Sequence, residues 1–516
     1  MQSRRDQVQA HLFVMSRLGA GMLRGEPDAL DLPTRRTVRG VRTGLFIAVV
    51  IALVMGLYGA IKPGGSAGWA KPGTLVVVKE TGARYLFVGG ELRPVLNQAS
   101  ARLVAGSRMT VTQVGQASLG AVPRGGPLGI VGAPDGLPAS SALARGDWLV
   151  CGLVAAGPSG RPGPVVSVAV GAAGSGRALG PDQGLLVAAS DGTGHVLWQG
   201  RRLRLGAGAA TALGYGTATP FPVAAAYLNS LPAGPDLALP EIAGRGAAGP
   251  ALAGRATRVG QLFTGPGGEP YVLTRKGLAA LDRTRFELLR GDPRTQREAY
   301  AGAPAVAVAV GAADLAAHSA PAGTLPAGGL PEAPPKLVEP GAGQGVCTAV
   351  RPAAGGGVST LVTVADAAAV AGRPVTPQPG VTAGCGAADL VAVRPGGGAL
   401  VRALSGAGAA GVTYLVADNG VKYPLPTDDA AKALGYPGAV DTGVPATLLS
   451  LLPSGPALDP SALAAAGVVD VTAGVPAPVC PGAEPAGGKG VKAGEALEVP
   501  RAGTSGAERA LGAVAP

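Results

Sequence analysis

The chain has 516 residues, of which 47% are hydrophobic, 3% aromatic and 15% charged, and its formal net charge is +11. This length allows several domains with cores of their own, while 86 Gly and 47 Pro favour short strands joined by many turns. The basic residues of the long C-terminal part are scattered, without a run and without interleaved aromatics. This pattern argues against nucleic acid as a partner and for a solvated or anionic-wall-facing surface.

The first predicted element is an amphipathic helix from Ser3 to Arg24, for which Ser3 can act as the N-cap. Its apolar residues recur at spacings of four, three, three and four, which places them on one helix face. This face is made by Val8, Leu12, Met15, Leu18 and Met22. Because residues 1–43 are too few to build a core, we expect the face to dock on a partner protein. The alternative is that it lies on the anionic leaflet of a membrane.

The second predicted element is an uncharged apolar stretch of 18 residues, from Gly44 to Ile61. At about 1.5 Å per residue it spans roughly 27 Å, close to the hydrocarbon thickness of a bilayer, so we predict one transmembrane helix. Four arginines precede it, Arg35, Arg36, Arg39 and Arg42, whereas only Lys62 and Lys71 follow within ten residues. The positive-inside rule therefore keeps residues 1–43 in the cytoplasm and exports the C-terminal region. The alternative, a cleaved signal peptide, would need a charged region of about forty residues, against about 15 to 30 for a whole signal peptide.

Small residues recur at every fourth position of the predicted span, at Ala48, Ala52, Gly56 and Ala60. Such a stripe lets a second helix approach closely and predicts packing against another transmembrane helix. Chance is the alternative, because the whole chain is rich in Ala and Gly.

The exported region opens with a Gly/Pro-rich linker, residues 62–72, and then repeats itself. Residues 212–215 (ALGY) match residues 433–436, and the LPxGP motif at residues 231–235 matches residues 452–456, both at a separation of 221 residues. No gap is needed between these blocks, which indicates an internal repeat. Each unit predicts a hairpin, a short Ala-rich helix ending at Gly-Tyr, and a Leu-Pro-x-Gly-Pro stop. Residues 74–96 and 261–281 are similar units, in each of which we predict two strands around a turn.

Four cysteines follow the predicted span and none precedes it. An even number in an oxidising compartment predicts two disulfides, for which the sequence leaves three connectivities. The segment around Cys151 resembles the segment around Cys347, 196 residues later, with a Pro/Gly turn and a Val-rich strand after each Cys. We therefore predict two related halves about a pseudo-two-fold axis, with equivalent strands that meet on the axis. This arrangement pairs Cys151 with Cys347 and leaves Cys385 with Cys480.

The fold class predicted from these elements is a single-pass membrane protein whose exported region, residues 73–480, is mostly β with short α-helices (α+β). Residues 320–343 read as a long unstructured surface loop, and residues 481–516 as a disordered Pro/Gly/Ala-rich tail.

The N-terminal hundred residues carry a family resemblance. The opening MQSRRDQVQAHLFVMSRLGAGMLRGEPD, the PTRR stretch, the single span and the block GARYLFVGGELRPVLNQASARLV resemble EccB, a core membrane component of the type VII (ESX) secretion machinery. The rest of the chain is similar in architecture, with an Ala/Gly-expanded sequence. The resemblance implies a single-pass cell-membrane subunit whose exported part is an elongated rod of four small repeats about a central domain bridged by a disulfide. It also implies partners: the FtsK-like motor EccC, the multi-spanning EccD, and EccE where present. We expect the exported repeats to associate with copies of themselves. The family's bridging cysteines correspond to Cys151 and Cys347, whereas Cys385 and Cys480 match no family pattern.

Some members of the family carry an ATPase label, which the residues here do not support. No GxxxxGK[ST] motif occurs, and the GxGxxG at Gly406, Gly408 and Gly411 precedes a strand-like run rather than a helix. Three isolated histidines, His11, His195 and His318, offer neither a catalytic triad nor a zinc ligand set. We therefore predict a structural subunit that supports protein export, with no catalytic residues, metal or cofactor. The alternatives are an ATPase of the same system, with ATP as its cofactor, and a cell-wall-binding module.

Overall fold

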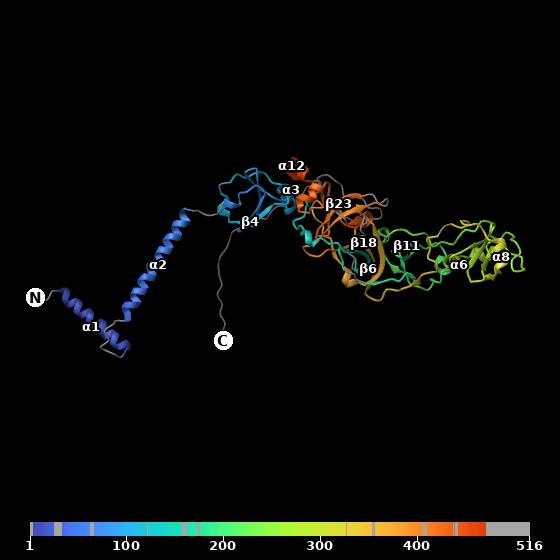
Figure 1. Ribbon diagram of the computed structural model, residues 1–516, viewed down its shortest axis with the longest axis horizontal. Coiled ribbons are helices and arrows are strands. Elements are labelled where there is room, and N and C mark those ends of the chain that lie inside the picture. Colours follow the sequence, from blue (N-terminus) through green and yellow to red (C-terminus); the bar gives the residue numbers. More distant parts are fainter. Residues whose placement is uncertain are drawn as a thin grey trace, which may run out of the picture.

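The computed structural model describes residues 4–24, 33–61, 67–120, 122–156, 162–172, 176–326, 328–352, 357–405, 410–436, 438 and 442–470. Two N-terminal helices precede an elongated body made of several small sheets (Figure 1).

Helix α1 (Arg4–Arg24) agrees with the predicted amphipathic helix, while its predicted cap, Ser3, lies outside the described residues. Helix α2 (Pro33–Ile61) ends where the predicted span ends but begins 11 residues earlier than Gly44. The basic residues before the span therefore belong to the same helix. Arginine has a good helix propensity and Pro33 suits a first helical position, so nothing in this segment ends the helix at the edge of the apolar stretch.

Four sheets share one strand order, β3-β2-β1-β4, β11-β10-β9-β12, β15-β14-β13-β16 and β24-β23-β22-β25. In each, the first three strands are antiparallel and the last runs parallel to its neighbour. The strands are β1 (Thr74–Val78), β2 (Arg84–Val88), β3 (Glu91–Pro94), β4 (Thr110–Val114), β9 (Gln183–Ala188), β10 (Gly194–Trp198), β11 (Arg201–Arg204), β12 (Phe221–Pro222), β13 (Leu262–Thr264), β14 (Pro270–Thr274), β15 (Gly277–Ala280), β16 (Val308–Ala309), β22 (Ala399–Leu404), β23 (Ala410–Val416), β24 (Lys422–Leu425) and β25 (Gly443–Pro445).

A short helix follows the third strand along the chain in each of these sheets: α3 (Gln98–Ala105), α4 (Ala209–Ala212), α6 (Arg283–Arg290) and α10 (Asp428–Leu434). Asn97, Asp282 and Thr427 cap three of these helices by accepting a hydrogen bond from the N–H three residues later. The other helices are α5 (Ala225–Ser230), α7 (Pro293–Ala299), α8 (Ala312–His318), α9 (Ala367–Val370), α11 (Ala446–Leu449) and α12 (Pro460–Ala466). The sequence patterns predicted α4 and α10, each ending just before Gly-Tyr, but not α5 or α11.

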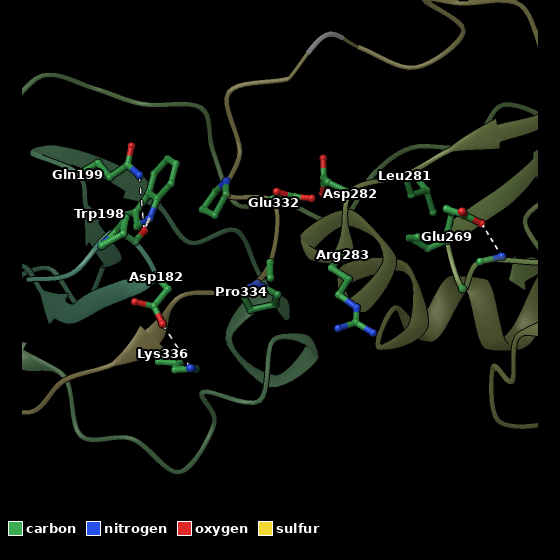
Figure 2. Close-up of a pocket in the computed structure, with 16 residues that line it drawn as sticks. Asp182, Trp198, Gln199, Glu269, Leu281, Asp282, Arg283, Glu332, Pro334 and Lys336 are labelled. Atoms are coloured by element: carbon green, nitrogen blue, oxygen red, sulfur yellow. Dashed lines mark hydrogen bonds and ion pairs between the residues drawn. The ribbon is translucent and has the colours of Figure 1, made fainter. Parts of the chain in front are cut away.

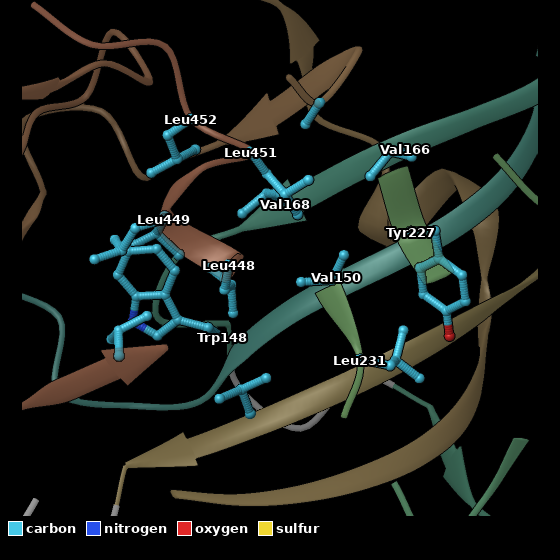
Figure 3. Packing of buried hydrophobic residues seen from close by; sticks show 14 of the residues in the cluster. Trp148, Val150, Val166, Val168, Tyr227, Leu231, Leu448, Leu449, Leu451 and Leu452 are labelled. Atoms are coloured by element: carbon cyan, nitrogen blue, oxygen red, sulfur yellow. The ribbon is translucent and has the colours of Figure 1, made fainter. Parts of the chain in front are cut away.

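A seven-stranded sheet with the order β20-β21-β7-β6-β18-β19-β8 occupies the centre of the body. Its strands are β6 (Trp148–Ala156), β7 (Pro162–Ala169), β8 (Arg177–Ala178), β18 (Gln344–Pro352), β19 (Val358–Asp366), β20 (Arg373–Pro374) and β21 (Leu390–Ala392). Trp148 and Val150 point to the face on which α5 and α11 pack, with Tyr227 and Leu448 among the contacts (Figure 3). The alternate residues of β6, including Cys151, belong to a separate core on the other face, beneath α9.

Three details of the sequence-based prediction need correction. The linker predicted at residues 62–72 already contains part of the folded body, because Trp69 is buried and packs edge-on against Phe87. The segment at residues 320–343 is not simply unstructured: it contains the strand β17 (Lys336–Leu337), which pairs with β9. The units at residues 74–96 and 261–281 hold three strands each rather than two.

The end of the described chain returns to the region of α3, where it forms a separate two-stranded sheet. β26 (Val468–Val469) pairs in parallel with β5 (Gly129–Ile130), while Asn97, before α3, donates to the carbonyl oxygen of Ile130. The tail predicted from residue 481 onward lies outside the described residues.

Candidate functional site

The predicted docking face of α1 is uncovered. Its five apolar residues are all more than half exposed, from 54% for Leu18 to 86% for Met22. Phe13 and Val14, which the predicted stripe omits, are exposed as well, at 58% and 53%. The apolar surface of α1 is therefore broader than the spacing rule indicated, and hydropathy alone marks the two extra residues. Exposed apolar surface of this extent is typical of a contact with a partner or a membrane.

Helix α2 has the length and composition of a membrane span. Its apolar stretch runs from Thr37 to Gly59 with a mean hydropathy of 2.2, and none of it is buried by the described chain. Ala48, Ala52 and Gly56 lie exposed along it, with no atom within 4 Å of the place where a Cβ on Gly56 would lie. The stripe is thus open to another helix. No helix in the described part of the chain packs against it, so its use in packing stays a prediction.

The predicted disulfide between Cys151 and Cys347 is present. The two residues lie directly opposite each other in β6 and β18, with Cα atoms 4.0 Å apart, and both are fully buried. The bond joins the two central strands of the seven-stranded sheet. Cys480 lies outside the described residues, so its pairing with Cys385 stays a prediction.

The three histidines lie in three separate elements, α1, β10 and α8. Across the described ranges, no group of three or more His, Cys, Asp or Glu residues could hold a metal ion. His195 is buried opposite Arg204 of β11, and its Nδ1 has no hydrogen-bond partner. Burial lowers the pKa of His195 below its ordinary value. The backbone of Thr193 opposes this shift, the charges of Arg202 and Arg204 add to it, and Asp191 opposes it least.

His195 should make the stability of the chain depend on pH. Because its folded-state pKa is lowered, the unfolded chain takes up a proton first, near pH 6.5, as the pH falls. We expect the urea midpoint of the chain to drop more steeply between pH 7 and pH 5 than that of the His195→Gln variant. Parallel slopes for the two proteins would contradict this expectation.

A cavity of about 1020 Å³ lies between the second and third small sheets (Figure 2). Trp198 and Gln199 line one side, and Glu269 and Arg283 the other. The lining holds four carboxylates and two cations. Lys336 pairs with Asp182 at 3.2 Å, and Asp282 pairs with Arg285 at 2.9 Å, which leaves Glu269 and Glu332 against Arg283. This excess of negative charge disfavours the polyphosphate of a nucleotide.

The glycine pattern near residue 411 does not form a dinucleotide-binding turn in the part of the chain that is described. Gly411 lies within β23, which leads to another strand and not to a helix. Gly406 and Gly408 lie outside the described residues. Backbone N–H groups at a helix N-terminus are what such a motif needs to hold a phosphate.

With this geometry in hand, comparison with known proteins identifies the family. The family model described as "Type VII secretion system ESX-1, transport TM domain B" matches residues 1–470. The chain belongs to the EccB family. A curated EccB relative, the "ESX-3 secretion system ATPase EccB3" of Mycolicibacterium smegmatis, is 31% identical over 475 residues, which cover 88% of this chain and 89% of the relative.

Solved structures of similar fold include an EccB3 dimer from the ESX-3 core complex. It is 27% identical to this chain, with a TM-score of 0.58, and the match covers 75% of this chain and 98% of that one. A chain of an intact ESX-5 inner membrane complex matches with the same TM-score of 0.58 and covers 93% of this chain and 98% of its own length. At 23% identity, the second match shows similarity of fold alone. EccB membership confirms the resemblance carried by the N-terminal hundred residues.

Proposed function

We propose that this EccB chain is an assembly subunit of a type VII secretion membrane complex, in which α1 and α2 bind the other membrane components. The exposed apolar surface of α1 is the observation that carries the proposal. Exposure of apolar side chains such as Leu12 and Met15 to water is unfavourable. Burial of each such side chain against another surface contributes about 1.5–3 kcal/mol to binding.

The proposed topology places α1 in the cytoplasm and the body from Trp69 onward outside the membrane. Its support is the charge asymmetry around α2, whose first turns carry Arg39 and Arg42 and whose last turn carries no basic residue. The partners proposed for the membrane region are an FtsK-type motor like EccC, a multi-spanning protein like EccD, and a protein like EccE. Self-association is part of the proposal as well, since a solved EccB relative is described as a dimer.

We further propose that the body consists of four repeats about a pseudo-two-fold axis. The shared strand order of the four small sheets supports the repeats. Two hydrogen bonds support the axis: the hydroxyl of Tyr215 donates to the carbonyl of Pro335 at 2.7 Å, and that of Tyr436 to the carbonyl of Pro138 at 2.8 Å. The tyrosines occupy matching repeat positions. Each half therefore holds, through its tyrosine, the segment that leads into the central strands of the other half.

The competing function is ATP hydrolysis, which the name of the EccB3 relative suggests. Hydrolysis by the purified chain that disappears on substitution of one lysine or aspartate would favour it. The acidic cavity between the second and third sheets makes a poor nucleotide site, which is why we place the assembly role first.

The assembly role predicts a specific loss of partners. We expect gentle-detergent purification of the full chain from its native membrane to recover an FtsK-like ATPase and a multi-spanning protein, identified by mass spectrometry. The triple variant V8D/L12D/M15D should lose both, because three charges would have to be buried in the docked surface.

The matched control is the triple variant Q9D/A10D/S16D, which adds the same charge to α1 outside the stripe of five predicted residues and should keep the partners. Recovery of the wild-type chain alone would remove the assembly proposal. Partner loss in both variants would show that charge, and not the apolar face, was responsible.

A further inference from the structure

The first small sheet ends in a strand with an open edge. β4 pairs only with β1 among the described strands, and it is five residues long, whereas the corresponding strands β12, β16 and β25 have two or three. β4 carries no charged residue, and its Val111 is 55% exposed. Edge strands are normally kept short or protected by charges, prolines or bulges, because an open edge pairs readily with another strand. β4 has none of these protections.

The backbone of β4 is oriented for such pairing. The N–H of Lys79 donates to the carbonyl of Val114 at 3.0 Å, so the backbone groups of Val114 point towards β1. Successive residues of a strand direct their backbone groups to opposite sides, so those of Val111 and Gln113 point away from the sheet. The outer edge therefore offers two N–H donors and two carbonyl acceptors in alternation.

We propose that β4 pairs in antiparallel fashion with β4 of a second copy of this chain, with the two-fold axis at Thr112. This register sets Val111 opposite Gln113 of the second copy, so that the outward backbone groups of both strands face one another. Each such pair exchanges two hydrogen bonds, as an antiparallel ladder requires. The two four-stranded sheets then form one continuous sheet.

Charges at the two ends of β4 suit this register. The carboxylate of Glu80 accepts a hydrogen bond from the N–H of Gln116 at 2.9 Å and therefore lies beyond the C-terminal end of β4. Arg108 is exposed and lies two residues before the N-terminal end. Pairing centred on Thr112 places position 108 of one copy opposite position 116 of the other, which brings each Arg108 beside Glu80 of the second copy. Opposite charges so placed favour this register over a slipped one.

The membrane anchor favours contact between the β4 edges of two copies. β1 begins 13 residues after α2 ends at Ile61, so the first sheet is tethered close to the span (Figure 1). Two copies assembled in one membrane complex would have a high effective concentration of β4 edges. The inference rests on the self-association proposed above and names the surface that provides it.

Cysteine cross-linking of the full chain in its native membrane tests the pairing. The two Thr112 residues would form a non-hydrogen-bonded pair with Cα atoms about 4.5 Å apart, which suits a disulfide. After mild oxidation, we expect Thr112→Cys to give several-fold more dimer on a non-reducing gel than Glu91→Cys. Glu91 is the matched control because it is exposed on β3, at the opposite edge of the same sheet. The wild-type chain gives the background from the native cysteines.

Two further changes separate pairing from simple proximity. Val111→Pro removes an outward N–H while leaving the hydrogen bonds to β1 in place, so in the Thr112→Cys background it should lower the cross-link several-fold. Arg108→Glu should lower it too, and adding Glu80→Lys should restore it. Equal cross-linking of Thr112→Cys and Glu91→Cys, or a cross-link to a different protein, would overturn the edge pairing. If the other secretion components still co-purify in that case, the assembly role stands and only the surface is wrong.

Discussion

Replacement of Asp292 by Ala should destabilise the chain by about 3–5 kcal/mol, because it would leave a buried arginine without its counter-ion. The Asp292 carboxylate is fully buried and pairs with the guanidinium of Arg245, which is 5% exposed. It also caps α7, accepting from the N–H of Arg294 at 2.9 Å and from the hydroxyl of Thr295 at 3.3 Å. Without it, Arg245 keeps only the hydrogen bond to the carbonyl of Pro240. Urea unfolding followed by far-UV circular dichroism measures the loss, and hydrogen exchange should localise it to α6 and α7.

Asp459→Ala is the matched control, since Asp459 caps α12 in the same way, through the N–H of Ser461, but pairs with no buried cation. Loss of a cap alone costs about 0.5–2 kcal/mol, so equal effects of the two substitutions would contradict the role of the buried pair.

The pH dependence of stability provides a second check on Asp292. Burial opposes ionisation of Asp292, but hydrogen bonds from Arg294 and Arg245, with their charges, lower its pKa overall. The stabilisation it contributes is therefore present above the ordinary aspartate pKa and should be lost as the pH falls below about 4.

The repeat motifs show which features a local sequence pattern can predict. Gly435 ends α10 with a left-handed backbone (φ 97°), and Gly214 has a similar φ of 78° after α4, which is why Gly-Tyr predicted both helix ends. The tyrosine that follows each glycine could not be assigned a partner in the same way. Tyr436 bonds to Pro138, almost 300 residues away in the chain, and no local pattern carries that information.

Short parallel strands were missed for a related reason. β12 and β16 have two residues each, too few to show an alternating pattern, and they form because a neighbouring strand offers a free edge. β17 lies in a Pro-rich segment that composition assigns to a loop, yet it pairs with β9. The candidate docking helix was predicted more completely, because an exposed amphipathic helix needs no distant partner to define its faces. Its extra apolar residues, Phe13 and Val14, lie outside the regular spacing.

The pairing of Cys151 with Cys347 was predictable because two similar segments each carried one cysteine in a matching strand. The shift of 196 residues that relates the cysteines also carries β6 (148–156) onto β18 (344–352). The structure confirms the disulfide at that register. What the sequence could not supply was the order of the outer strands β8, β20 and β21, which join the sheet from loops of irregular sequence.

Removal of this disulfide should cost about 2–5 kcal/mol, because it closes a long loop that includes the second and third small sheets. The two cysteines are 196 residues apart in sequence, and the strands that carry them form the centre of the seven-stranded sheet, so the bond restricts the unfolded chain over that whole length. We expect the Cys151→Ala/Cys347→Ala variant to unfold at a clearly lower urea concentration than the wild type. Loss of two buried side chains contributes as well, so the substitution alone does not isolate the cross-link.

A reductant separates the two contributions. If the cross-link matters, dithiothreitol should lower the urea midpoint of the wild type more than that of the double variant, because any other disulfide of the chain is present in both proteins and its effect cancels. An equal response would mean that Cys151 and Cys347 stabilise the sheet by packing alone. In the expected case, the β6–β18 pair depends on an oxidising compartment for much of its stability, which agrees with the proposed export of the body.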